Sequence, residues 1–236
     1  MKNISKILRE TSHRPFPLPE RKWQNYQEWQ NVIFAHWRVN VSLLQKLVPE
    51  DLAIDLYNGE AWISLVAFTL KKFRHQFLPI IPGFHEINMR TYVVKNNKPG
   101  IYFLSREVQR SFPSILSRLL FGSGYYKSDI YHSNNLLESE NREHLFYLKT
   151  RYNPGNMVLV KTDLDRWLTD RFVSYKELDD EIYSYEFHHE DWPLRIIDTD
   201  TFEINYRYGN LLISRKADLY HYSDGLLVPS WGKSQA

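Results

Sequence analysis

The order of apolar and polar residues along the chain predicts a protein built mainly of β-strands. The run EINMRTYVV (86–94) alternates with a period of two, which places its side chains on two faces of one strand. The stretch 61–70 is apolar at nearly every position, so we expect a strand covered on both sides. Asn58-Gly59 precedes it and predicts a tight hairpin turn, because both residues tolerate positive φ. The two faces of 86–94 carry Ile87, Met89, Thr91 and Val93 on one side, and Glu86, Asn88, Arg90 and Tyr92 on the other.

Short helices interrupt these strands. Asn40 is placed to cap the first helix and Pro49 to end it. Apolar residues at helical spacing predict a second helix that ends on Gly122. Thr162 and Asp165 resemble a capping box at the start of the third. The three predicted helices lie near residues 41–48, 112–121 and 163–171.

The first 22 residues differ from the rest of the chain. Prolines at positions 15, 17 and 19 exclude regular helix there, so we expect an extended arm laid over the body. No repeat, low-complexity tract or Gly/Ser linker divides the remainder, which predicts one domain over residues 1–236. The fold class that follows is α+β: a mainly antiparallel β-barrel with a few short helices packed outside.

Composition narrows the function classes. Aromatic residues make up 15% of the chain, which favours a wide apolar core or pocket. The 30 Lys and Arg nearly balance the 28 Asp and Glu, so we expect no nucleic-acid partner. No segment has the roughly 18 apolar residues that span a membrane, and the N-terminus lacks the apolar core of a signal peptide. We therefore expect a cytoplasmic protein, and the abundance of tyrosine suggests a homodimer.

The sequence contains few clusters of residues that could bind a metal ion. The chain has no cysteine, which excludes thiolate metal sites and disulfides. His85-Glu86 and His188-His189-Glu190 are the close clusters, but adjacent strand residues point to opposite faces. Neither cluster reproduces the histidine pair, four residues apart, that brings two ligands to one metal. We expect neither a metal nor a cofactor.

Several sequence blocks in register carry a family resemblance across most of the chain. The blocks, in chain order, are VIFAHWRVNVSLLQKLVPEDL, NGEAWISLVAF, EINMRTYVV, KPGIYFL, FGSGYY and LTDRF. They resemble the YqjF-like family of bacterial proteins, a domain of unknown function of the DUF2071 type. More remotely, the middle of the chain is similar to acetoacetate decarboxylase. This resemblance implies a related barrel with a central pocket.

The decarboxylase resemblance also implies positions for its functional residues. Its glutamate would fall near Glu86, its Gly-x-Tyr on Gly100–Tyr102, and its lysine pair on Tyr125 and Tyr126. The first of those lysines forms a Schiff base with substrate. A phenol cannot form an imine, so that mechanism cannot be carried over to this chain.

Lys127 is the residue that could replace the missing nucleophile. On a strand it shares a face with Tyr125, but Asp129 on the same face would stabilise its ammonium form. Two interpretations stay open: a catalytic lysine, and a solvated or ion-paired lysine, which we favour.

The remaining candidates lie on two strands. Arg90 could clamp a ligand carboxylate and Glu86 could act as acid or base, although their face could instead meet solvent. The two lie roughly 13 Å apart along one strand, so they cannot neutralise each other. His36, in an apolar strand, is either a hydrogen-bonded core histidine or a pocket residue. The candidate ligand-binding residues are His36, Glu86, Arg90, Tyr125 and Lys127.

Two functions fit these residues. The first is a module that binds a small organic, carboxylate-like molecule in the central barrel pocket without Schiff-base chemistry. The alternative is an enzyme, lyase- or decarboxylase-like, that acts on keto-acid substrates, with Tyr125 as a hydrogen-bond donor.

Overall fold

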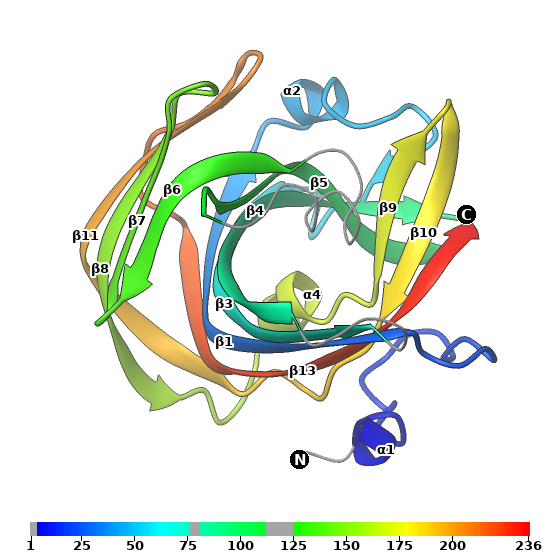
Figure 1. Cartoon of the computed structure of the whole chain (residues 1–236). Helices are drawn as coiled ribbons and strands as arrows, with labels where there is room; N and C mark the ends of the chain where they lie inside the picture. The colour runs from blue at the N-terminus through cyan, green and yellow to red at the C-terminus, as the bar shows by residue number, and fades with distance from the viewer. Residues whose placement is uncertain (1–3, 76–80, 112–124) are drawn as a thin grey trace.

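The computed structural model describes residues 4–75, 81–111 and 125–236. Long strands curl around a common axis, as Figure 1 shows. The helices are α1 (Ile4–Ile7), α2 (Val41–Gln45) and α4 (Asp163–Thr169). The strands are β1 (Asn25–Val39), β2 (Ala53–Ile54), β3 (Ala61–His75), β4 (Ile81–Lys95), β5 (Lys98–Gln109), β6 (Tyr126–Ser133), β7 (Leu136–Asn141), β8 (Phe146–Met157), β9 (Val173–Leu178), β10 (Glu181–Phe187), β11 (Leu194–Tyr208), β12 (Leu211–Ile213) and β13 (Leu219–Gln235).

One set of strands closes into a ring. Hydrogen bonding runs in the order β4-β3-β1-β13-β10-β9-β5, and β5 pairs with β4 again. Every pairing in this ring is antiparallel except that of β5 with β9, where Ile101 lies opposite Ser174. The predicted, mainly antiparallel β-barrel with a few short helices is therefore confirmed.

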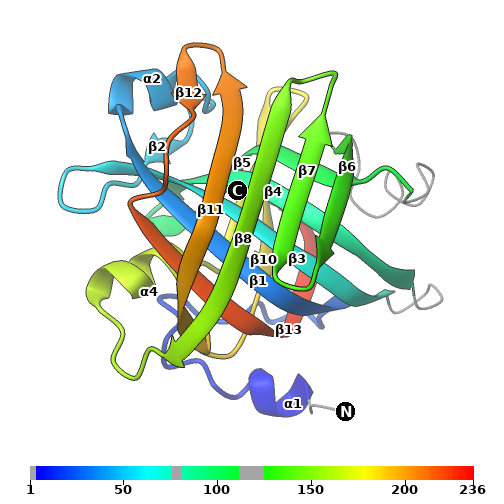
Figure 2. The same ribbon diagram turned by 90° about the vertical axis from the view of Figure 1, so that its left-hand side faces the viewer.

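A second layer of strands lies on the other side of β1, β3 and β4. It runs through β6, β7, β8 and β11, which returns to β13 (Figure 2). The shared strands consequently have a core on each face. On β1, Ile33, Ala35 and Trp37 belong to one apolar cluster, whereas Val32 and Phe34 belong to another. This double coverage explains why 61–70 is apolar on both faces, as predicted.

The predicted turn at Asn58-Gly59 is present, but it does not join two paired strands. Both residues have positive φ, and Tyr57 bridges to Glu60. The apolar run before the turn forms β2, which pairs with β4 through Ala53 and Val94 rather than with β3. The turn itself was predicted correctly. The predicted pairing of the two strands that flank it was wrong, because which strands pair depends on contacts that are distant in sequence.

The helix predictions at 41–48 and 163–171 are confirmed by their caps. The side chain of Asn40 accepts a hydrogen bond from the amide of Leu43 at 3.1 Å. At α4, Thr162 and Asp165 exchange the two hydrogen bonds of a capping box. The predicted helix at 112–121 lies outside the described residues. Within the described part of the chain, no helix is long and apolar enough to cross a membrane.

The described part of the N-terminal arm contacts the ring but is not wholly extended. Residues Ile4–Ile7 form the single turn α1, ahead of the prolines that exclude helix further on. The ring nitrogen Nε2 of His188 lies 3.1 Å from the carbonyl oxygen of Ile7. The buried Arg14 guanidinium donates to the carboxylate of Glu186 at 2.6 Å. These contacts fix the arm to the end of β10.

Candidate functional site

A cavity of about 640 Å³ opens inside the ring. Its wall is formed by β1, β4, β5, β9, β10 and β13, together with Tyr125 just before β6. The face of β4 that carries Glu86, Asn88 and Arg90 lines this cavity and is buried. The expectation that this face could meet solvent is therefore wrong: both faces of β4 are covered, because a core lies on each side of the strand.

Glu86 lies at one end of this polar row. Its carboxylate accepts a hydrogen bond from the side-chain amide of Asn88 at 3.4 Å and is also hydrogen-bonded to Tyr125. Burial raises the pKa of Glu86 to about 7, although the nearby Arg106 charge and these hydrogen bonds act in the opposite direction. A carboxyl group with such a pKa can donate or accept a proton near neutrality.

Tyr125 and Arg106 complete this end of the cavity. The Arg106 guanidinium carbon lies 4.3 Å from the centroid of the Tyr125 ring, and NH1 donates to the phenolic oxygen at 3.3 Å. Burial raises the pKa of Tyr125 far above its usual value, so the phenol remains a neutral hydrogen-bond donor. Glu86, Tyr125 and Arg106 thus form one compact acid, donor and cation cluster.

Arg90 lies at the other end of the row and differs from Arg106 in its partners. Its side chain is buried, with the residue only 5% exposed, yet it makes no ion pair with any described residue. One amino group donates to the carbonyl oxygen of Leu168 at 3.4 Å, and Tyr92 is a further hydrogen-bond neighbour. Its Nε has no partner within the described parts of the chain. A buried guanidinium with a spare donor has the chemistry to bind an anion.

The separation of Glu86 and Arg90 agrees with the sequence-based expectation. Their register partners on β3 are Phe68 and Ser64, which lie four residues apart. Glu86 interacts with Arg106 instead of Arg90. The polar row therefore has the Glu86 carboxyl at one end and, at the other, the Arg90 cation, which forms no ion pair with a described residue.

His36 is not among the residues that line the cavity, and it is separated from Arg90 in the sheet by Ser64, which pairs with both residues. It is fully buried, and its Nδ1 lies 2.6 Å from the hydroxyl of Ser64. Its Nε2 lies 3.1 Å from Nδ1 of His221, whose Nε2 lies 2.8 Å from Asp165. The geometry matches the interpretation of His36 as a hydrogen-bonded core histidine.

Lys127 also lies outside the cavity lining. It is on β6 opposite Val108 of β5, and partial burial lowers the pKa of its amine. Asp129, expected to stabilise the Lys127 ammonium, pairs instead with Arg110 at 2.9 Å. Tyr125 therefore lies in the cavity wall, whereas Lys127 does not.

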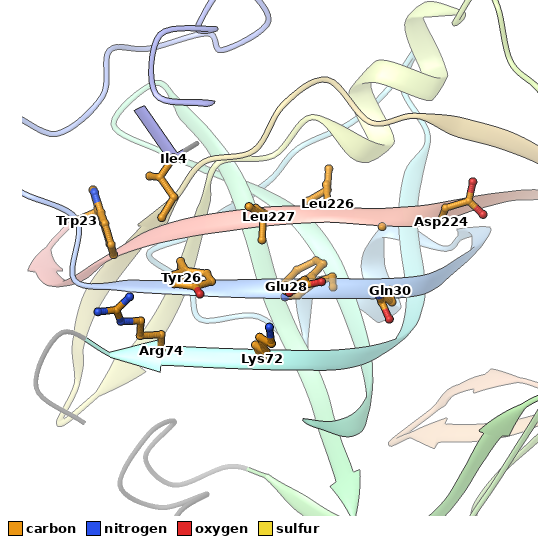
Figure 3. Close-up of a pocket in the computed structure, with 12 residues that line it drawn as sticks. Ile4, Trp23, Tyr26, Glu28, Gln30, Lys72, Arg74, Asp224, Leu226 and Leu227 are labelled. Atoms are coloured by element: carbon orange, nitrogen blue, oxygen red, sulfur yellow. The ribbon is translucent and has the colours of Figure 1, made fainter. Parts of the chain in front are cut away.

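A second hollow lies under α1, on the opposite side of β1 (Figure 3). Ile4 and Trp23 face its floor, where Tyr26, Glu28 and Gln30 alternate with the β1 residues of the ring cavity. Glu28 pairs with Lys71, and the neighbouring Lys72 and Arg74 are exposed to solvent. Solvated charges of this kind make a weaker ligand site than the buried row on β4.

Arg106 is the site residue that the sequence did not reveal. A register shift lies between Met89 and Arg90, so that Arg90 faces Phe103 while Asn88 faces Arg106. Strict alternation would put Phe103 and Arg106 on opposite faces of β5. The bulge places both on the cavity face, and no turn residue in IYFLSREV signals it.

The closed ring of strands defines the fold class of the protein. The structure has an acetoacetate decarboxylase-like fold. The enduracididine biosynthesis enzyme MppR in complex with pyruvate superimposes with a TM-score of 0.63 at 10% identity, over 92% of this chain and 91% of that one. Acetoacetate decarboxylase from Legionella pneumophila superimposes with a TM-score of 0.53 at 12% identity, over 97% and 94% of the two chains.

Sequence comparison identifies the family within that class. The DUF2071 family, described as an uncharacterized conserved protein, matches residues 26–227, and the chain belongs to it. The uncharacterized protein YqjF of Bacillus subtilis (strain 168) is 36% identical over 188 residues, which cover 75% of this chain and 78% of that protein. The resemblances stated from sequence motifs are confirmed.

Proposed function

We propose that the ring cavity binds a small organic carboxylate, with Arg90 as its anion-binding group and without Schiff-base chemistry. The observation that carries this proposal is the buried Arg90 guanidinium, which has an unpartnered Nε and no ion pair among the described residues. A desolvated guanidinium without a counter-anion is unfavourable, and a ligand carboxylate would supply the missing charge and acceptor atoms.

The other cavity groups give the ligand a second polar end. The unpartnered Oδ1 of Asn88 can accept a hydrogen bond from a ligand hydroxyl, and Tyr125, whose phenol is hydrogen-bonded to Glu86, also lines the cavity. A keto or hydroxy acid that spans the row would place its carboxylate on Arg90 and its other oxygen toward Asn88 and Tyr125. MppR is recorded with pyruvate, and the ligand class proposed here includes that acid.

Titration calorimetry against a panel of short keto and hydroxy acids tests this proposal. We expect at least one acid to bind the wild type and to lose tenfold or more in affinity with Arg90→Gln. The matched control is Arg110→Gln, because Arg110 is exposed and paired with Asp129 outside the cavity. Binding that is equally strong in Arg90→Gln, or no binding by any acid, would reject the proposal.

Borohydride reduction tests the absence of Schiff-base chemistry. The wild type is incubated with each acid and with simple ketones, reduced, and weighed by mass spectrometry. We expect an unchanged mass, because tyrosine occupies both lysine positions of the decarboxylase. An added mass that disappears with Lys127→Gln would identify Lys127 as a nucleophile and contradict this part of the proposal.

The alternative function is acid–base catalysis on a keto acid. The observation that favours it is Glu86, whose pKa of about 7 suits proton transfer at neutral pH beside the Arg106 cation and the Tyr125 hydroxyl. Turnover of a keto-acid panel that Glu86→Gln abolishes, with binding retained, would support an enzyme. Binding of a keto acid without turnover would support the binding function and argue against an enzyme.

A further inference from the structure

A buried chain of hydrogen bonds begins and ends on α4. The hydroxyl of Tyr92 donates to the carbonyl oxygen of Leu168 at 3.0 Å, and the hydroxyl of Ser64 lies 2.5 Å from the Tyr92 oxygen. Ser64 continues to His36, and His36 continues to His221 and then to Asp165, at 2.6, 3.1 and 2.8 Å. Five hydrogen bonds thus connect the first and last turns of one helix.

The groups at the two ends of this hydrogen-bond chain can only accept hydrogen bonds. Leu168 contributes a carbonyl oxygen, and Asp165 contributes a carboxylate that also accepts from the amide of Thr162. The hydrogen bond from His221, with those from Thr162, lowers the pKa of Asp165 to about 2, so this carboxyl is ionised. Every proton in the five hydrogen bonds must come from the four groups between the ends.

When those four groups are neutral, they carry too few protons to supply all five hydrogen bonds. Tyr92 and Ser64 each have one hydroxyl proton, and a neutral histidine has one ring N–H. Four protons cannot fill five hydrogen bonds. The chain is complete only when one of its imidazoles is protonated on both nitrogens.

The bond directions and the flanking charges together identify that imidazole. Tyr92 donates to Leu168, so Ser64 donates to Tyr92 and Nδ1 of His36 donates to Ser64. Nε2 of His221 donates to Asp165, so either ring can supply the proton of the bond between them. His221 lies against the Asp165 carboxylate, whereas burial and the nearby Arg90 charge lower the pKa of His36 well below its usual value, which places the extra proton on His221.

We propose that this chain holds one excess proton as a His221 imidazolium, and that the buried charge forms part of the cationic end of the ring cavity. The charged groups around it are Asp165, Arg90 and Arg171, and Arg171 pairs with Asp55 at 2.5 Å and also interacts electrostatically with Asp170. The excess proton makes this cluster one charge unit more positive than it would be without the proton. Arg90 and Tyr92 both donate to the carbonyl oxygen of Leu168. His36, Ser64 and His221 are therefore positioning residues, because they act on Arg90 only through Tyr92 and this carbonyl.

The electrostatic part of this inference rests on the proposed anion-binding function, whereas the proton itself does not. An anion on Arg90 and a proton on His221 stabilise each other, and the coupling is reciprocal. Affinity for a carboxylate should accordingly fall when the chain loses its excess proton.

Nitrogen-15 NMR of the ligand-free full chain, labelled at histidine, tests the proton inventory. We expect both ring nitrogens of His221 to show the protonated imidazolium pattern at pH 7, with His221→Gln used for assignment. In Ser64→Ala the remaining bonds need only neutral histidines, so His221 should revert to a neutral tautomer at pH 7. Tyr92→Phe removes the same requirement by a different route and serves if Ser64→Ala fails to fold.

Ser139→Ala is the matched control, because this buried hydroxyl on β7 has no hydrogen-bond partner among the described residues and is not part of the hydrogen-bond chain. It should leave the imidazolium pattern unchanged. A neutral pattern for both His36 and His221 in the wild type, or an unchanged imidazolium in Ser64→Ala and Tyr92→Phe, overturns the inference.

Pyruvate titration of the same variants tests the coupling. We expect Ser64→Ala to weaken pyruvate binding roughly three- to tenfold at pH 7, and Ser139→Ala to leave it unchanged. If Ser64→Ala and the wild type bind pyruvate equally well, the excess proton does not contribute to the anion affinity of the cavity. A wild type that does not bind pyruvate would count against the proposed function alone, since the NMR result requires no ligand.

Discussion

The Arg106 guanidinium lies over the ring of Tyr125, 4.3 Å from its centroid, and donates to its hydroxyl at 3.3 Å. The two residues come from β5 and from the segment before β6, and both adjoin Glu86. Arg106 is therefore the cation that limits how far burial raises the pKa of Glu86.

Arg106→Gln should raise the pKa of Glu86 above about 7, because the mutation removes the positive charge that favours the carboxylate. A carbon-13 NMR titration of the glutamate carboxyl groups measures the change, with Glu86→Gln for assignment. Arg110→Gln should leave the titration where it is. A pKa that falls or stays constant in Arg106→Gln would contradict the assigned contact.

Glu86 should make the protein less stable as pH rises. Its folded-state pKa of about 7 exceeds the ordinary value of 4.5, so the native state binds more protons than the unfolded state between these values. The stability lost over this interval is about 3 kcal/mol by the linkage relation. Urea unfolding at pH 4 and pH 8 should show Glu86→Gln close to wild type at pH 4 and more stable at pH 8. Equal stability of the two proteins at pH 8 would refute the raised pKa. Glu138→Gln, at a side chain that is 40% exposed, should show no such effect.

Two substitutions at the start of α4 should differ in cost. Thr162→Ala removes one cap and should destabilise the protein by about 1 kcal/mol. Asp165→Asn removes the cap and also the carboxylate partner of buried His221, so the loss should be about 3 kcal/mol. Denaturant unfolding at pH 7 compares them, and a smaller loss for Asp165→Asn than for Thr162→Ala would show that the His221 contact contributes nothing.

Gly225 is required where β13 approaches β1. Its φ is +122°, and an added Cβ would overlap the carbonyl oxygen of Trp29. Gly209 also has positive φ, but no atom of the described residues lies within 4 Å of the position of its missing Cβ. Gly225→Ala should therefore lower the thermal midpoint much more than Gly209→Ala, whose cost is about 1 kcal/mol from backbone strain alone. Similar midpoints for the two variants would contradict the close approach.

Period-two alternation and local capping signals predicted much of the fold. The two faces of 86–93 and the caps at Asn40 and Thr162 depend only on nearby residues, and all were found as expected. The closure of the ring could not be derived in this way, because β5 meets β9 and β10 meets β13 across long separations in sequence. The family resemblance supplied that information instead.

The candidate site was predictable only in part. Glu86, Arg90 and Tyr125 line one cavity, but His36 and Lys127 are not part of its lining. His221 reaches His36 because β13 pairs with β1, and sequence alone gives no sign of this pairing. A one-residue register shift put Arg106 on the cavity face, which alternation cannot anticipate.

The homodimer, the cytoplasmic location and the absence of a cofactor stay predictions. Light scattering of the purified full chain would measure its mass in solution and test the first of these. A monomer at micromolar concentration would contradict it.

The most direct test of the central claim is the NMR signal of the Arg90 Nε–H group during titration with a small keto acid such as pyruvate. We predict that this signal shifts in a saturable way, because Nε is the donor left without a partner in the described structure. The Arg110 signal should not move. A saturating ligand that leaves the Arg90 signal unchanged, or a titration in which no acid of the panel perturbs it, would contradict the assignment of this cavity as a carboxylate site.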